Sequence, residues 1–153
     1  GYGALLFATA LTNRSIADAL AETRWHALYR QIGTEAMQAA RVRSVQAESF
    51  NGFDVAAFSP EAPDAAFRAS IDAMVAHNAK SSKTHSGIWR DLAVRKRKTE
   101  VDAQIAIIAD LAEEVRVPAP AIRALVAMVH DIEDGRRPLD DATLDALAAA
   151  VAK

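Results

Sequence analysis

Apolar residues recur at steps of three and four along most of the chain, which is the spacing of one face of an α-helix. The longest such stripe runs from Glu22 to about Val45 and predicts a long amphipathic helix. Its inward positions are Trp25, Leu28, Tyr29, Ile32, Ala36, Ala39 and Val42. No segment alternates apolar and polar residues with the period of two that marks a half-buried strand. The pattern therefore predicts an all-α fold.

Capping and breaking residues divide the other stripes into separate helices. Together they predict a compact bundle of six or seven helices in a single domain over residues 1–153. The signals are a stop at Thr12-Asn13 after a helix over Tyr2–Leu11, a short turn of helix at Ile16–Leu20, Pro63 as a first helical residue, Thr99 as an N-cap, Pro118 and Pro120 as a helix start, Gly135 as a stop, and Asp140 or Asp141 as the cap of the last helix.

The periodicity fails between Lys80 and Lys98, the longest irregular stretch in the chain, and a loop of this length in a compact domain is usually functional or disordered. We call residues 80–98 the basic segment. It has a net charge of +6, whereas the whole chain has a formal net charge of −2. Its cations are Lys80, Lys83, Arg90, Arg95, Lys96, Arg97 and Lys98, against one acid, Asp91. An acidic helical body thus carries one segment suited to an anion such as a phosphate or a carboxylate.

Composition narrows the classes of function. Of the 153 residues, 51% are hydrophobic and 25% are charged, which is typical of a globular domain. The absence of cysteine excludes disulfides, thiol catalysis and a cysteine zinc site, and is compatible with a reducing compartment, so we expect a cytoplasmic protein. The four histidines lack metal-ligand spacing, so no metal site is expected. The apolar start, Gly1–Leu11, is too short to cross a bilayer.

Two neighbouring motifs carry a resemblance to a known family. Ser86-Gly-Ile-Trp-Arg-Asp91, followed by Arg97-Lys-Thr-Glu-Val-Asp102, resembles the Ser-x-x-x-x-Asp … Arg-x-Thr-Glu-[Ile/Val]-Asp signature of the C-terminal domain of ketopantoate (2-dehydropantoate) 2-reductases. Weaker likenesses are Glu35 in the long helix, Val117-Pro118, and Ile132–Arg137. The resemblance implies a helical fold like the C-terminal domain of 6-phosphogluconate dehydrogenase.

The resemblance also implies a reaction and partners. Family members reduce a 2-keto acid, ketopantoate, to the 2-hydroxy acid pantoate with NADPH. An N-terminal Rossmann domain binds the cofactor and the helical domain closes over the cleft. Because the chain opens inside an apolar segment and lacks a Gly-x-Gly-x-x-Gly loop, we expect that domain to precede Gly1 and this fragment alone to be inactive. The family's general-acid lysine would fall just before Gly1, and Gly3 stands at the position of its asparagine.

The resemblance assigns roles within the basic segment and just after it. Glu100 is expected to be the catalytic carboxylate, although a first-turn acid favoured by the helix dipole is the plain alternative. Ser86, Gly87 and Asp91 are expected to bind substrate, with Gly87 replacing a second serine; Asp91 could instead cap a helical turn at Leu92–Val94. Arg97 is the candidate for a cofactor phosphate.

Two other functions stay open at this point. The long Glu22–Val45 helix could serve as a dimerisation surface, since helical halves of related dehydrogenases form subunit contacts, and a homodimer is compatible with the enzyme hypothesis. The run Arg95–Lys98 could instead bind nucleic acid or a regulatory partner. Neither nucleic acid nor a membrane is the expected partner, because the body is acidic and no aromatic stacking platform accompanies the basic run.

Overall fold

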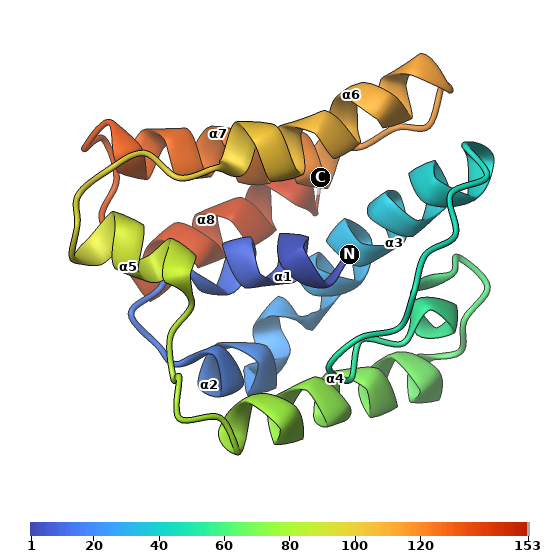
Figure 1. The fold of residues 1–153 in the computed structure, drawn as a ribbon, viewed down its shortest axis with the longest axis horizontal. Helices are drawn as coiled ribbons and strands as arrows, with labels where there is room; N and C mark the ends of the chain where they lie inside the picture. Colours follow the sequence, from blue (N-terminus) through green and yellow to red (C-terminus); the bar gives the residue numbers. More distant parts are fainter. Residues whose placement is uncertain (153) are drawn as a thin grey trace.

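The computed structural model describes residues 1–152, which form eight α-helices, three short helical segments and no strand (Figure 1). The all-α prediction is confirmed. The elements are α1 (Tyr2–Thr9), α2 (Ile16–Ala21), η1 (Thr23–Trp25), α3 (His26–Val42), η2 (Val55–Phe58), α4 (Asp64–Ala79), α5 (Gly87–Ala93), η3 (Asp102–Ala106), α6 (Ile107–Glu114), α7 (Pro120–Glu133) and α8 (Asp141–Val151).

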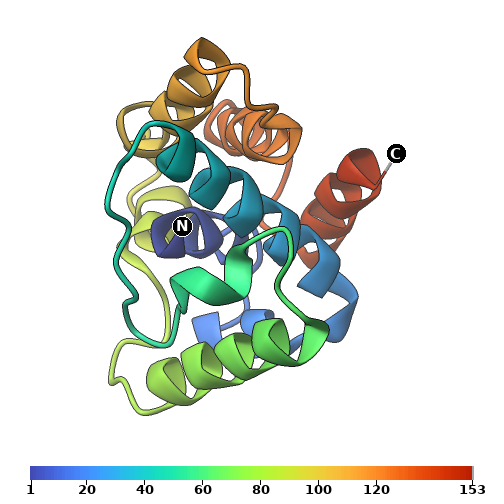
Figure 2. The same ribbon diagram turned by 90° about the vertical axis from the view of Figure 1, so that its right-hand side faces the viewer.

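Helix α1 is the central element of the bundle. Its sequence is apolar on every side, as expected of a helix surrounded by others. It packs against α2, α3, α7 and η3, and Leu5, Phe7 and Ala8 are almost completely buried. Only Gly3 of this helix is exposed, with Tyr2 and Leu6 half-buried. Figure 2 shows α5 on one side of the molecule, α8 on the other and α1 between them.

The long helix α3 ties the two ends of the chain together. It contacts α1, α6, α7 and α8 through most of the inward stripe predicted from the sequence. The prediction is wrong for Val42, which ends the helix with 54% of its surface exposed, and Trp25 is buried in η1 ahead of it. Glu35 on this stripe is 5% exposed, and its carboxylate accepts hydrogen bonds from the backbone N–H groups of Ala121 and Ile122, both at 3.0 Å. These groups belong to the first turn of α7, where backbone donors have no partner within the helix. Glu35 therefore fixes α7 onto α3.

Most of the predicted boundaries agree with the structure to within a few residues. Gly135 follows α7 with a φ of +76°, and Asp140 accepts a hydrogen bond from the backbone N–H of Ala142 at 2.8 Å as the cap of α8. The long helix begins later than predicted, at His26, after the separate turn η1. Residues 1–152 form one helix more than the six or seven that the sequence predicted. This additional helix is α5, which lies inside the basic segment where the sequence showed no helical periodicity.

Candidate functional site

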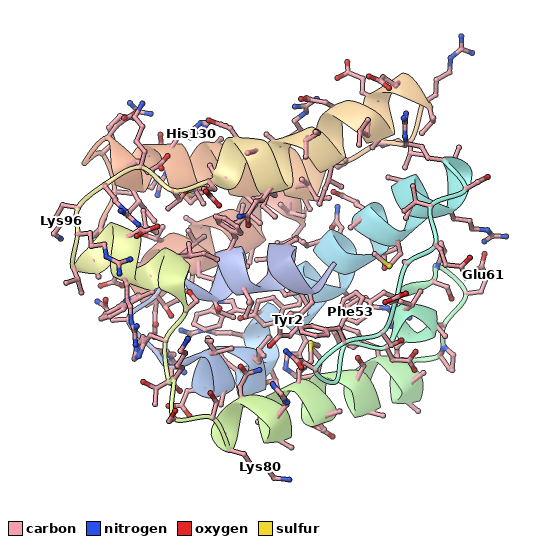
Figure 3. All side chains as sticks on the ribbon, viewed as in Figure 1. Tyr2, Phe53, Glu61, Lys80, Lys96 and His130 are labelled. Carbon is pink, nitrogen blue, oxygen red and sulfur yellow. The ribbon has the colours of Figure 1, made fainter. Side chains whose placement is uncertain are left out.

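The basic segment is anchored to the body by its own polar side chains. Ser86 caps α5, because its hydroxyl accepts a hydrogen bond from the backbone N–H of Trp89 at 3.2 Å. The Trp89 indole N–H donates to the Asn13 side-chain oxygen at 3.2 Å, and the His85 ring packs on Trp89 and bonds the Asn13 carbonyl at 2.9 Å. Trp89 and His85 thus pack the segment onto the body. Lys80 and Lys96, near its two ends, point away from the body (Figure 3).

Asp91 organises the turn that follows α5. One carboxylate oxygen accepts hydrogen bonds from Arg95 at 2.9 Å and from Arg97 Nε at 2.8 Å, and the Asp91 carbonyl accepts from the Arg97 backbone N–H at 3.0 Å. The idea that Asp91 caps a turn at Leu92–Val94 is wrong, since Asp91 lies in the body of α5 and Ser86 is the cap. Within residues 1–152 the two outer nitrogens of Arg97 make no hydrogen bond or ion pair, and its side chain is 62% exposed.

The charge of Asp91 sets a pH dependence for this turn. The hydrogen bond from Arg95 is the main cause that holds the pKa of Asp91 below its ordinary value, and Arg97 adds to it against partial desolvation. Because the folded pKa is the lower one, the stabilisation is complete above the ordinary pKa of about 3.9 and is lost as pH falls through the folded value. We expect the Arg97 Nε–H NMR resonance to move to that of a free arginine only below about pH 4. In Asp91→Asn the Arg97 Nε–H resonance should not change in this pH range. A change identical to that of the wild type would contradict the assignment of this titration to Asp91.

Glu100 lies at the start of the helix that continues through η3 into α6. Its side chain is exposed and accepts a hydrogen bond from the side-chain amide of Gln104 at 2.6 Å. Residues Asp102–Ala106 form a π-helical turn, a rare conformation that is often found at functional sites. Since η3 packs against α1, Glu100 stands at the end of an element that flanks the central helix.

Thr99 and Glu133 fix the position of Glu100. The Glu133 carboxylate accepts hydrogen bonds from the Thr99 backbone N–H at 2.5 Å and from its hydroxyl at 3.2 Å. The Thr99 hydroxyl in turn accepts from the backbone N–H of Val101 at 3.2 Å, so Thr99 bonds the start of the helix from a position two residues before it. Beside this turn, His130 of α7 bonds Asp102 at 2.9 Å. The turn that carries Glu100 is therefore held by α7.

Gly3 and Gly87 both border open space. A Cβ atom built on either glycine would meet no other atom within 4 Å. Both residues are exposed, Gly3 on α1 and Gly87 at the first position of α5. The positions where the resemblance places an asparagine and a serine are thus sterically free to hold those side chains.

Gly87→Ser is accordingly expected to fold normally. A side chain at this position clashes with nothing and reduces the freedom of the unfolded chain, so the free energy of unfolding should rise by about 0.5 kcal/mol. Urea denaturation followed by circular dichroism measures the change. A loss of more than about 1 kcal/mol would show that the space beside α5 is filled.

An apolar groove of about 530 Å³ opens beside the start of α1, and we call it the α1 groove. Its walls come from α1, the C-terminal half of α3, the chain after α3, and α6. The lining residues are Gly1, Tyr2, Gly3, Ala36, Met37, Ala39, Ala40, Arg43, Val45, Ala47, Glu48, Phe50, Phe53, Ile108 and Leu111. Tyr2 and Phe53 lie close to the start of α1 in Figure 3.

The structure brings some of the predicted site residues into contact or onto the same helix, but it does not connect all of them. Ser86, Gly87 and Asp91 share α5, and Asp91 binds Arg97 directly. Among residues 1–152, no hydrogen bond or ion pair links Glu100 to any of these four. Sequence reasoning did not single out Gln104 as the partner of Glu100, although its i+4 spacing on a helix was a usable signal.

Two negative findings apply to the described part of the chain. Within it, no group of three or more His, Asp or Glu side chains is arranged to hold a metal ion. None of its helices is both long enough and apolar enough to cross a membrane.

The helical fold, together with the Ser86–Asp91 and Arg97–Asp102 motifs, is that of the C-terminal domain of ketopantoate-reductase-like proteins. Residues 3–133 match the family described as ketopantoate reductase PanE/ApbA, C terminal, and the chain belongs to this family. The family groups with the ketopantoate-reductase-like oxidoreductases. No curated protein and no solved structure gives a significant match to the chain.

Proposed function

We propose that this chain is the substrate-binding and closing domain of an NADPH-dependent 2-keto acid reductase related to 2-dehydropantoate 2-reductase. The observation that carries the proposal is the position of Glu100. It begins the η3–α6 helix, which packs along α1. The start of α1, next to which the resemblance places the catalytic lysine, lies beside Ile108 of the same helix, about two turns further along. Family membership over residues 3–133 supports the same function.

Glu100 would act on the substrate from an exposed and oriented position. The Gln104 amide holds one carboxylate oxygen at 2.6 Å and leaves the other free to accept a hydrogen bond. A fixed acceptor of this kind orients a keto acid and the group that protonates its oxygen, which lowers the entropic part of the barrier. Ser86 retains a hydroxyl proton to donate while it caps α5.

The cofactor would be held mainly by a Rossmann domain outside this chain. When bound, NADPH supplies the hydride that reduces the keto carbon. Within this chain, Arg97 fits a cofactor phosphate, because Asp91 occupies its Nε and orients the guanidinium while the outer nitrogens stay available. Substrate and cofactor would lie on the side of the molecule that carries α5 (Figure 2).

Substitution of Glu100 in the full-length protein tests the proposal. We expect Glu100→Gln to lower kcat for reduction of a 2-keto acid by about 100-fold, since the charged acceptor is lost while the shape is kept. The initial rate of NADPH oxidation, measured at the same starting NADPH concentration for every variant, gives kcat. Glu61→Gln makes the same change at an exposed residue of the loop before α4 and should leave kcat unchanged. Equal rates for the two variants would contradict the role of Glu100.

A further inference from the structure

We propose that the α1 groove binds the side chain of the substrate, and that this side chain is large and apolar, an aromatic ring or a long aliphatic group. The inference rests on the proposed reductase function and names the substrate class. The groove's volume of about 530 Å³ lies within the range of small-molecule sites, about 300–1,000 Å³. A keto acid with a small or hydroxylated side chain would leave most of it unfilled.

The walls of the groove favour an aromatic or aliphatic occupant. Tyr2 and Phe50 meet edge to face, with ring centroids 5.7 Å apart, and Phe50 is 60% exposed, so its ring has free apolar surface. Small side chains of α3 also line the groove and leave room for a ring; they are Ala36, Ala39 and Ala40. Burying apolar surface here stabilises a bound ring by about 25 cal/mol per Å².

The groove offers little to a polar side chain. The Tyr2 hydroxyl accepts a hydrogen bond from the Asn78 amide at 3.2 Å, and Arg43 pairs with Glu114 at 2.9 Å. Glu48 is the only other ionisable side chain in the lining. A ligand hydroxyl buried against the remaining walls would lose its hydrogen bonds to water, which costs about 1–3 kcal/mol. The lining therefore selects against hydroxylated side chains.

The groove is also in the right place relative to Glu100. Ile108 in its wall follows Glu100 by eight residues on the same continuous helix, a separation of about 12 Å along the helix axis. The glutamate side chain and a ring-bearing keto acid can span this distance together. Gly3 lines the groove on the exposed side of α1, and a Cβ atom built there would meet no other atom within 4 Å.

Filling the groove in the full-length protein tests the inference. The variant is Ala40→Phe, and Ala27→Phe makes the same change at an exposed position of the same helix outside the groove. We expect Ala40→Phe to raise KM for phenylpyruvate by about tenfold and to leave the kinetics with pyruvate unchanged. Ala27→Phe should change neither. Phe50→Ala removes a largely exposed ring without risk to the fold and should also raise KM for phenylpyruvate.

A second readout separates failure of this inference from failure of the proposed function. Ligand-observed NMR measures phenylpyruvate binding without turnover. We expect a binding signal with the wild-type protein and a weaker signal with Ala40→Phe. Turnover of keto acids with KM for phenylpyruvate unchanged in both groove variants would overturn the inference and leave the reductase function intact. No turnover of any keto acid would contradict the reductase function, and absence of phenylpyruvate binding in wild type would overturn the groove assignment itself.

Discussion

Replacing Glu35 with alanine is expected to lower the free energy of unfolding by about 3 kcal/mol, because two buried backbone donors lose a charged acceptor. Its carboxylate oxygens accept from the N–H groups of Ala121 and Ile122, at 3.0 Å each, and the Gln31 amide donates to one of them at 3.1 Å. The negative charge also lies at the positive end of the α7 dipole, which adds to the stabilisation.

Urea denaturation of the wild-type chain and of Glu35→Ala measures this loss. Glu35→Gln keeps the shape and one acceptor oxygen, so it should lose about half as much. Glu61→Ala removes a glutamate side chain that is exposed and should change the stability by less than about 0.5 kcal/mol. A loss below about 1 kcal/mol for Glu35→Ala would mean that the start of α7 is not held through Glu35.

Replacing Trp25 with alanine is expected to cost about 4 kcal/mol, the range found for removal of a large buried aromatic side chain. Trp25 is 0% exposed, and its indole N–H donates to the Asp145 carboxylate at 2.8 Å. The guanidinium groups of Arg14 and Arg24 lie over the ring, 5.2 Å and 4.7 Å from its centroid. The ring thus joins η1 to α8 and to the turn after α1.

Thermal and urea unfolding of Trp25→Ala and Trp25→Phe separate the contributions. The phenylalanine variant keeps much of the buried area and loses the hydrogen bond to Asp145, so we expect a loss of about 1–2 kcal/mol. A fully folded Trp25→Ala with wild-type stability would contradict the packing described for η1.

Most of the fold followed from local signals in the sequence. The stripe of α3 and the stops at Gly135 and Asp140 were readable because one helix face is apolar and each end carries a capping or breaking residue. Helix α5 was not predicted, since seven residues are too few to display a helical period. The local signal for this helix is the cap residue Ser86.

The site was predictable in its residues but not in its contacts. The sequence placed Asp91 and Arg97 in one basic segment, yet their ion pair depends on the turn that the chain makes after α5. The link from Glu133 to Thr99 joins residues 34 apart, which no local pattern encodes. The α1 groove likewise needs four elements to meet at the start of α1. The roles of Ser86, Gly87 and Glu100 toward a substrate stay predictions.

The most direct test of the central claim is to follow a deuterium label from NADPH to the product in the full-length protein. NADPH deuterated at C4 on either face would be incubated with the protein and phenylpyruvate, and the product examined by NMR. We predict a 2-hydroxy acid that carries deuterium at C2 from one of the two labelled cofactors, in an amount equal to the NADPH consumed. A chain that folds and binds NADPH but transfers no deuterium to C2 of this or any other 2-keto acid would contradict the account.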